Sequence, residues 1–385
     1  MHTAKRLIAV AGLLVLGSIG SVTATQGAHA ASVFKGHVYV NDNTSGTNTI
    51  AAFNRFANGS LTAIANSPFA AGGQGTGAGI GSQGSLQLSS DGRFLLAADA
   101  GSNQISVLSI NSDGSLTPVT GSPVSSGGNK PVSIAVHGSF VYVANAGAGG
   151  SNYTGFTLSS GGALTPLSNS TFLLSDAANP GDVLFNSSGT NLIGTEVGTS
   201  KIDSFTVGTD GSLTAAAGSP FTAQGAGPFG SEFRPTNPTE LYVSNAHNGG
   251  TNLGTVSAFN VDNAGILTSI GPSPYPDLQN APCWVEISHD GRYLFAVNTA
   301  SSSISSYSIQ PDGSLKLLKG STPFGGAVHG EEDARLDPTD SNLYVVDSGS
   351  NAVSAFTVSG GSLSELASSP VSLPTGAHPF GIVVD

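Results

Sequence analysis

The sequence predicts an all-β fold, a seven-bladed β-propeller with four antiparallel strands per blade, and three observations lead to this prediction. A Gly-x-Leu phrase that is followed six or seven residues later by a Ser/Thr-Pro-like turn occurs seven times, and its leucines, from Leu61 to Leu363, lie 48 to 55 residues apart. Short runs of β-forming residues fill every interval, and no stretch keeps a helical period. The two ends of the chain each carry an incomplete repeat. Strand-built repeats of this length are typical of propeller blades.

Each repeat divides into four strand-like runs. The first precedes a turn, as at 284–287, and the second is the richest in β-forming residues, as at 294–297. The third alternates apolar and small polar residues, as at 256–259, and the fourth begins at the repeated leucine. Asp-Gly pairs at 113–114, 210–211 and 312–313 join the third run to the fourth, and we expect positive φ angles at these hairpin turns.

The chain ends are expected to close the ring. Residues 379–384 have the form of a first strand with no second strand after it, whereas residues 36–40 have the form of a second strand with no first strand before it. Pairing the C-terminal strand with the N-terminal strands would complete one blade and remove two open sheet edges.

Residues 1–30 are predicted to be a signal peptide. A basic start with Lys5 and Arg6 precedes an apolar run at 7–19 that is too short to span a bilayer, and residues 28–30 have the small-x-small pattern of a cleavage site. The alternative is an uncleaved N-terminal anchor. We therefore expect a secreted protein, extracellular, periplasmic or at the cell surface, with one domain over residues 31–385, no membrane span in the mature chain and a monomeric state.

Composition excludes several classes of partner. The chain has 24 acidic against 12 Lys and Arg residues, a net charge of −12, and removal of Lys5 and Arg6 makes the mature protein more acidic still. Such a surface repels nucleic acid and anionic membranes. Cys283 is the single cysteine, so no intramolecular disulfide is expected and a small buried side chain is the simplest interpretation. A small molecule or an extracellular ligand remains as the expected partner.

Two faces of the predicted ring differ in their loops. We call the side with the turns between first and second strands and between third and fourth strands the hairpin face, and the opposite side the loop face. Because variable loops on a rigid scaffold usually carry function, we expect the site on the loop face. The Gly-rich stretch 72–84 lacks the Lys-Ser/Thr ending of a phosphate loop and is interpreted as a flexible loop leading into a first strand.

One polar residue ends each second strand on the loop face. Capping of the strand end explains most of them, although carboxylates there can also bind a cation or act as a base. The positions are Asn41, Asp99, Asn145, Glu196, Asn245, Asn298 and Asp347.

The densest charged cluster of the chain is His329 to Asp333. Its carboxylates Glu331, Glu332 and Asp333 are the oxygen ligands that calcium prefers, so calcium is the candidate cofactor. The alternative interpretation is a solvated loop. The sequence contains no His-x-x-x-His pair and no second cysteine, so no residue pattern indicates a zinc site.

The repeat resembles the lactonase-type seven-bladed propellers. The segment from Pro282 to Asn298 and the repeated Tyr-Val-x-Asn and Asp-Gly-Ser-Leu phrases carry the resemblance over nearly the whole mature chain. That family includes 6-phosphogluconolactonases, carboxymuconate-cyclising enzymes and exported bacterial proteins with Tyr-Val-Thr-Asn repeats. The resemblance implies a catalytic His, Arg, Glu and second Arg.

The catalytic residues implied by the resemblance are mostly replaced in this chain. In register, the His position falls at Gly181 and Asp182, the first Arg at Phe229, the Glu at Ala246 before His247, and the second Arg near Glu331 with Arg335 further along. The resemblance therefore implies a lactonase-like fold with degenerate catalytic residues.

Two functions follow as hypotheses. The first is a module that binds a ligand or partner, with contacts expected from Asp176, Asp182, Phe229, Trp284, His329 and Arg335. The second is a divergent lactone hydrolase or cyclase that acts on an extracellular substrate through Glu196, His247, Glu331 and His378. An enzyme requires at least two of these side chains within hydrogen-bond reach of one another near the axis.

Overall fold

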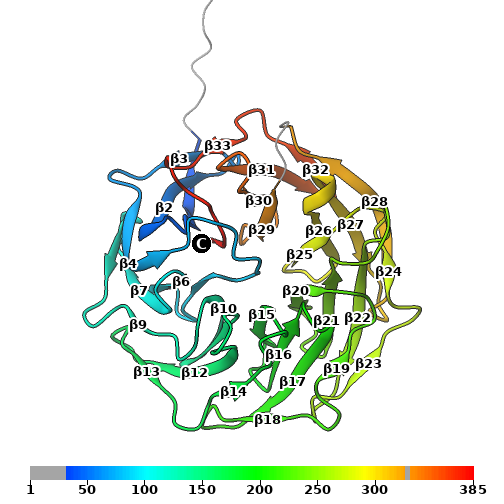
Figure 1. The fold of residues 1–385 in the computed structure, drawn as a ribbon. Helices are drawn as coiled ribbons and strands as arrows, with labels where there is room; N and C mark the ends of the chain where they lie inside the picture. The colour runs from blue at the N-terminus through cyan, green and yellow to red at the C-terminus, as the bar shows by residue number, and fades with distance from the viewer. Residues whose placement is uncertain (1–31, 326–329) are drawn as a thin grey trace, which may run out of the picture. The chain divides into compact units, whose positions relative to one another are not determined.

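The computed structural model describes residues 32–325 and 330–385, and the predicted signal peptide at 1–30 lies outside them. Within residues 33–385, the sheets stand around a common axis in a ring (Figure 1). The described residues form seven antiparallel sheets, as predicted, six with five strands and one with four. Among these residues, no helix has the length and hydropathy that a membrane crossing requires.

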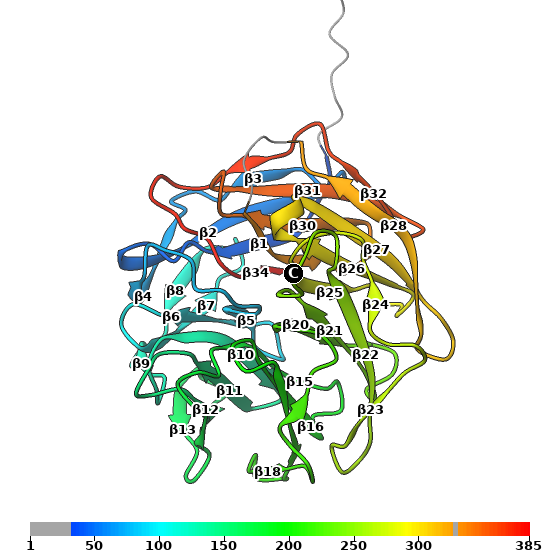
Figure 2. The same ribbon diagram turned by 45° about the vertical axis from the view of Figure 1, so that its right-hand side comes forward.

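The inner strands surround the axis (Figure 2). From blade 1 to blade 7 they are β34 (Ile382–Val384), β5 (Leu86–Leu88), β10 (Pro131–His137), β15 (Pro180–Phe185), β20 (Pro228–Phe233), β25 (Pro282–Ile287) and β29 (Glu331–Leu336). The second strands are β1 (Phe34–Asn41), β6 (Phe94–Asp99), β11 (Phe140–Asn145), β16 (Asn191–Glu196), β21 (Glu240–Asn245), β26 (Tyr293–Asn298) and β30 (Asn342–Asp347).

The outer strands complete each blade in the same order. The third strands are β2 (Gly46–Phe56), β7 (Gln104–Ile110), β12 (Asn152–Leu158), β17 (Lys201–Val207), β22 (Thr255–Val261), β27 (Ser303–Ile309) and β31 (Ala352–Ser359). The fourth strands are β3 (Leu61–Ala63), β8 (Leu116–Pro118), β13 (Leu164–Pro166), β18 (Leu213–Ala215), β23 (Leu267–Ser269), β28 (Leu315–Pro323) and β32 (Ser362–Glu365).

A short fifth strand, which the sequence did not reveal, pairs with the third strand in six blades of the described chain. These strands are β4 (Phe69–Gly75), β9 (Val124–Ser125), β14 (Phe172–Leu173), β19 (Phe221–Thr222), β24 (Tyr275–Pro276) and β33 (Val371–Ser372). The serine before the proline of the repeat fixes this extension: Ser122 Oγ, for example, accepts the Val107 amide at 2.7 Å. The single 3-10 helix of the described residues is η1 (Thr299–Ser301).

Pairing of the chain ends closes the ring, as predicted. Strand β34 pairs antiparallel with β1, with Val40 opposite Ile382 and Val38 opposite Val384. The final residue is also held, because Arg55 Nη2 donates to the Asp385 carbonyl at 2.6 Å. The closed ring leaves blade 1 with an inner strand from one terminus and outer strands from the other.

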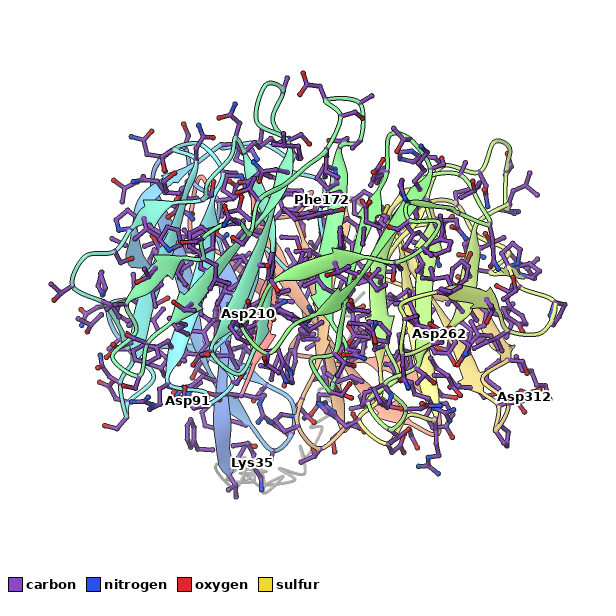
Figure 3. All side chains as sticks on the ribbon, turned by 90° about the horizontal axis from the view of Figure 1, so that it is seen from below. Lys35, Asp91, Phe172, Asp210, Asp262 and Asp312 are labelled. Carbon is purple, nitrogen blue, oxygen red and sulfur yellow. The ribbon has the colours of Figure 1, made fainter. Side chains whose placement is uncertain are left out.

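The hairpin turns differ in detail from the prediction. Only the glycines take a positive φ, 79° at Gly114 and 83° at Gly211. The preceding aspartate instead caps the turn: Asp113 Oδ1 accepts the Ser115 amide at 3.0 Å. The Asp-Gly pairs therefore form the turns as predicted, but the aspartate and the glycine have separate roles. Figure 3 shows the turn residues Asp91, Asp210 and Asp312 on the hairpin face, away from Phe172 on the loop face.

Tyrosines of the second strands connect each such turn to the preceding blade. Their hydroxyls donate to the carbonyl of the glycine in the Gly-x-Leu phrase, so the two repeated phrases of the sequence form one interblade contact. The pairs are Tyr39 with Gly114 (3.0 Å), Tyr142 with Gly211 (2.7 Å), Tyr242 with Gly313 (2.8 Å) and Tyr344 with Gly59 (3.0 Å).

Candidate functional site: an axial pocket

Residues 80–85, which lead into β5, cross the axis of the ring. We call them the axial segment. In Figure 1 the blue chain between β4 and β6 runs into the centre of the ring. Ile80, Ser82 and Gln83 are buried, with Gln83 only 2% exposed. The expectation of a flexible loop at 72–84 is therefore wrong at both ends, because residues 72–75 belong to β4 and residues 80–84 are enclosed by the inner strands.

The axial segment forms hydrogen bonds with all six other blades. Ser82 Oγ donates to Val132 O in blade 3 (2.6 Å), Gln83 N to Gly181 O in blade 4 (2.9 Å), Gln83 Nε2 to Ser231 O in blade 5 (2.9 Å), Gly84 N to Asp333 Oδ2 in blade 7 (3.1 Å) and Ser85 Oγ to Phe380 O before β34 (2.7 Å). In blade 6, Val285 N donates to Gln83 Oε1 at 3.1 Å and Trp284 Nε1 donates to Ser82 O at 2.8 Å.

Gly230 permits this close approach. A Cβ atom at position 230 would collide with Gln83 Oε1 and would lie 2.7 Å from the Cys283 carbonyl oxygen. Phe229 and Trp284 pack edge to face beside the segment, with ring centroids 5.3 Å apart, and Ile80 belongs to the same core cluster. These two predicted ligand-binding aromatics therefore hold the axial segment.

Below the axial segment lies a cavity of about 340 Å³, which we call the axial pocket. This volume is in the range of small-molecule sites. Its lining includes Pro235 and His289 from the turns after β20 and β25, so the pocket extends to the hairpin face. Its polar lining residues are Gln83, Gln87, Asp182, Ser231, Glu232, Glu286, His289 and Arg335.

Equivalent positions of six inner strands form a ring around this pocket. Each of these residues pairs with the third residue of the six-residue second strand in its own blade. The repeat therefore places all of them at the same height along the axis of the ring. They are Gln87, Ala135, Leu184, Glu232, Glu286 and Arg335 in blades 2 to 7. Charged residues thus occupy blades 5 to 7, whereas Ala135 and Leu184 give blades 3 and 4 an apolar surface.

Arg335 is the centre of the charged side. Its Nη1 donates to Asp333 Oδ1 at 3.2 Å, to Glu286 Oε2 at 3.3 Å and to the Ala334 carbonyl at 2.8 Å. Burial lowers the pKa of the guanidinium, but the carboxylates of Asp333, Glu286, Glu232 and Asp182 together outweigh burial and raise it. Among the described residues, every hydrogen bond of this side chain comes from Nη1, which leaves Nε and Nη2 for other partners.

Burial raises the pKa of each pocket carboxyl. For Asp182 it raises the pKa to about 7, against the opposing effect of hydrogen bonds from Ser231 and Ser133. Burial, and then the charge of Glu286, raises the pKa of Glu232 well above its usual value, although Arg335 opposes this. The Glu232 carboxylate has no hydrogen-bond partner among the described residues. Titratable groups with shifted pKa values in one cavity are typical of functional sites.

Three of the four predicted catalytic residues, Glu196, His247 and His378, have separate surroundings. Glu196 ends β16 and accepts a hydrogen bond from Thr199, while His247 and His378 are exposed on the loop face. Glu331 begins β29 opposite Asp347. No hydrogen bond or ion pair within the described residues joins any two of Glu196, His247 and His378. Asp176, another predicted contact, is exposed and accepts the Gly149 amide at 2.8 Å.

The carboxylates proposed for calcium have different partners. Glu332 Oε1 accepts the Ser348 hydroxyl at 2.6 Å, whereas Asp333 binds Gly84 N and Arg335. The described residues contain no group of three or more acidic, His or Cys side chains arranged to hold a metal ion. His329 lies outside the described residues. Calcium binding here stays a sequence prediction, and this geometry gives it no support.

Two of the polar residues that end the second strands have different kinds of partner. Asp347 Oδ1 accepts the Ser350 amide at 3.0 Å, a capping contact onto nearby backbone, whereas Asn245 Nδ2 donates to Ser257 Oγ of the adjacent third strand at 2.9 Å. Both residues are buried.

Sequence reasoning found Asp182 and Arg335 but missed Glu232, Glu286, Gln83 and Gln87. A signal was present: Glu232, Glu286 and Arg335 all occupy the fifth position of a six-residue first strand, in three consecutive blades. Charges at equivalent inner-strand positions are unexpected in a chain of which only 9% is charged.

The sequence profile of the family described as lactonase, 7-bladed β-propeller, matches residues 34–185 and 233–379. The chain belongs to this family. No curated protein matches the chain in sequence.

Solved structures agree with the lactonase-family fold. A candidate 6-phosphogluconolactonase from Bacteroides uniformis is 20% identical, with a TM-score of 0.71 over 90% of this chain and 98% of that one. The periplasmic gluconolactonase of Pseudomonas aeruginosa is 17% identical, with the same TM-score and the same two coverages. Virginiamycin B lyase from Staphylococcus aureus is 15% identical, with a TM-score of 0.52 over 80% of this chain and 90% of that one. At these identities the likeness concerns the fold alone.

Proposed function

We propose that this lactonase-family propeller is an exported binding protein, and that its ligand is a small uncharged ring with hydroxyl groups, held in the axial pocket. The observation that carries the proposal is the divided ring of inner-strand residues. Glu232, Glu286 and Arg335 offer hydrogen-bond partners to the polar edge of such a molecule, while Ala135 and Leu184 offer an apolar surface to its face. Ligand sites of this kind combine apolar walls with a few placed polar groups.

The charges of the pocket disfavour an anionic ligand. Asp182, Glu232, Glu286 and Asp333 surround a single arginine, and two of these carboxylates already bind its Nη1. Phosphorylated or carboxylated sugars require cationic groups that are not shared in this way. The proposal therefore differs from the activity in the name of the Bacteroides protein.

Export is part of the proposal because of the first thirty residues. Their basic start, apolar run and small-x-small ending have the order of a secretory signal. An exported protein binds its ligand outside the cell, which is consistent with an uncharged, unphosphorylated ring.

Lactone hydrolysis is the second candidate, supported by Glu232. Its carboxylate faces the pocket without a hydrogen-bond partner in the described part of the chain, and its raised pKa suits a general base. The Nε and Nη2 groups of Arg335 can bind the carbonyl oxygen that gains charge as water attacks. Ionised Glu232 would take a proton from that water, so turnover would rise with pH as Glu232 loses its own proton.

Calorimetry and a hydrolysis assay separate these functions. We expect gluconolactone and neutral sugars to bind and 6-phosphogluconate not to bind, with Glu232→Gln weakening the affinity by about tenfold. Asp176→Asn, which removes a loop-face carboxylate, is the matched control and leaves binding unchanged. Binding of 6-phosphogluconate alone would contradict the proposal. Turnover above the spontaneous rate that Glu232→Gln abolishes would establish the enzyme instead.

A further inference from the structure

We infer that the axial segment, residues 80–85, is a fixed plug that closes the loop-face end of the axial channel, so that small molecules reach the axial pocket only from the hairpin face. The inference deepens the proposed function, because it names the route to the same pocket. It rests on contacts of the chain with itself and not on the identity of the ligand.

Successive residues of the plug bind successive blades. Ser82, Gln83 and Gly84 reach carbonyl or carboxylate groups of blades 3, 4, 5 and 7. An ordinary surface loop leaves most of its backbone groups to water. Here a short stretch is held from all sides of the ring, so opening it would break bonds in every direction at once.

The Gln83 side chain is the central part of the plug. Its amide spans the axis, with Nε2 donating to Ser231 O at 2.9 Å and Oε1 accepting Val285 N at 3.1 Å. Both polar ends are therefore satisfied by inner strands, which a buried amide requires. The absence of a side chain at Gly230 leaves the space that the Gln83 oxygen fills.

The opposite end of the channel has no comparable segment among the described residues. The pocket extends past Glu232 to Pro235 and His289, which lie in the turns of the hairpin face, and Pro235 is exposed. A molecule that reaches Glu232 must therefore pass these turns. Gln83 forms the closed end of the axial pocket and limits how deeply such a molecule enters.

A cysteine at the pocket tests the route without any ligand. Burial raises the pKa of Cys283 to about 12, so the native thiol gives little background. In Glu232→Cys, a small thiol reagent should label the new cysteine, and adding Pro235→Trp at the hairpin face should slow labelling by about tenfold. Adding His378→Trp on the loop face is the matched control and should leave the rate unchanged.

The reverse result, slowing by His378→Trp and not by Pro235→Trp, would overturn the inference. Hydrogen exchange of the unaltered protein provides a second measurement. The Gln83 and Gly84 amides should exchange as slowly as those of the inner strands, and exchange within seconds would contradict a fixed plug. Because neither experiment uses a ligand, failure of the plug and failure of the proposed binding are separate outcomes.

Discussion

The two ends of the axial channel use similar residues for opposite purposes. At the loop-face end, both ends of the Gln83 side-chain amide and the backbone amides of Gln83 and Gly84 are bound to inner strands. At the hairpin-face end, the Glu232 carboxylate and part of the Arg335 guanidinium face a cavity. Long, variable loops therefore do not by themselves locate a site on a propeller. A site needs unsatisfied polar groups and space, and here both lie beneath the short turns.

Among the changes that test this comparison, removal of residues 379–385 should have the largest effect on stability. It deletes β34, the hydrogen bond from Ser85 to Phe380 and the Arg55 contact with Asp385, so both the closed ring and the plug lose support. We expect the melting temperature to fall by more than about 10 °C. Thermal unfolding followed by circular dichroism checks this, and a melting curve equal to that of the full chain would contradict the role of closure.

Arg335→Met should be the most damaging single substitution at the pocket. It leaves the buried carboxylates of Asp333 and Glu286 without their cation, which typically costs about 3–5 kcal/mol in free energy of unfolding. Arg93→Met is the control, because its pair with Asp91 is exposed and should contribute less than about 1 kcal/mol. Denaturant unfolding measures both free energies, and equal losses would show that Arg335 stabilises the fold no more than an exposed arginine does.

Stability should decrease as the pH rises toward neutrality. Burial raises the pKa of Asp42 and Asp182 to about 7 and that of Asp99 to about 6. A carboxyl whose pKa is higher in the folded state binds its proton more tightly there, so its ionisation destabilises the fold between about pH 4 and about pH 7. Melting temperatures should therefore be highest at mildly acidic pH.

Two variants separate the contribution of the axial pocket to this pH effect from that of the loop face. Asp182→Asn should remove the share of the pH-dependent decrease in melting temperature that comes from the axial pocket. Asp42→Asn should remove the share that comes from the loop side of blade 1. Melting scans across this pH range provide the measurement. A melting temperature that increases steadily with pH in the unaltered protein would show that these carboxyls are not buried as described.

Tyr242→Phe should have a small effect. It removes the hydroxyl that donates to the Gly313 carbonyl at 2.8 Å and lies 3.2 Å from Glu240 Oε2, a loss of about 1 kcal/mol in free energy of unfolding, while the ring stays in place. His247→Ala, at an exposed loop-face position, should change unfolding by less than about 0.5 kcal/mol. A larger loss at His247 would show that the loop face contributes more than its contacts indicate.

Strand alternation and turn residues repeat locally along the chain, so the seven blades, their strand order and the closure by β34 could all be predicted from the sequence. The same local signals made Asp182 and Arg335 visible as candidates. They could not show that Glu232, Glu286 and Arg335 meet across three blades, since that depends on the register of strands about fifty residues apart.

The open end of the channel depends on contacts between blades, which the sequence did not predict. Residues 72–84 have the composition of a flexible loop, and nothing local in them predicts a buried course. The surrounding inner strands supply the partners that order residues 80–85 across the axis. Packing of six other blades around one glycine-rich segment overrides its local preference, and thereby places the candidate site on the face that the loops alone did not indicate.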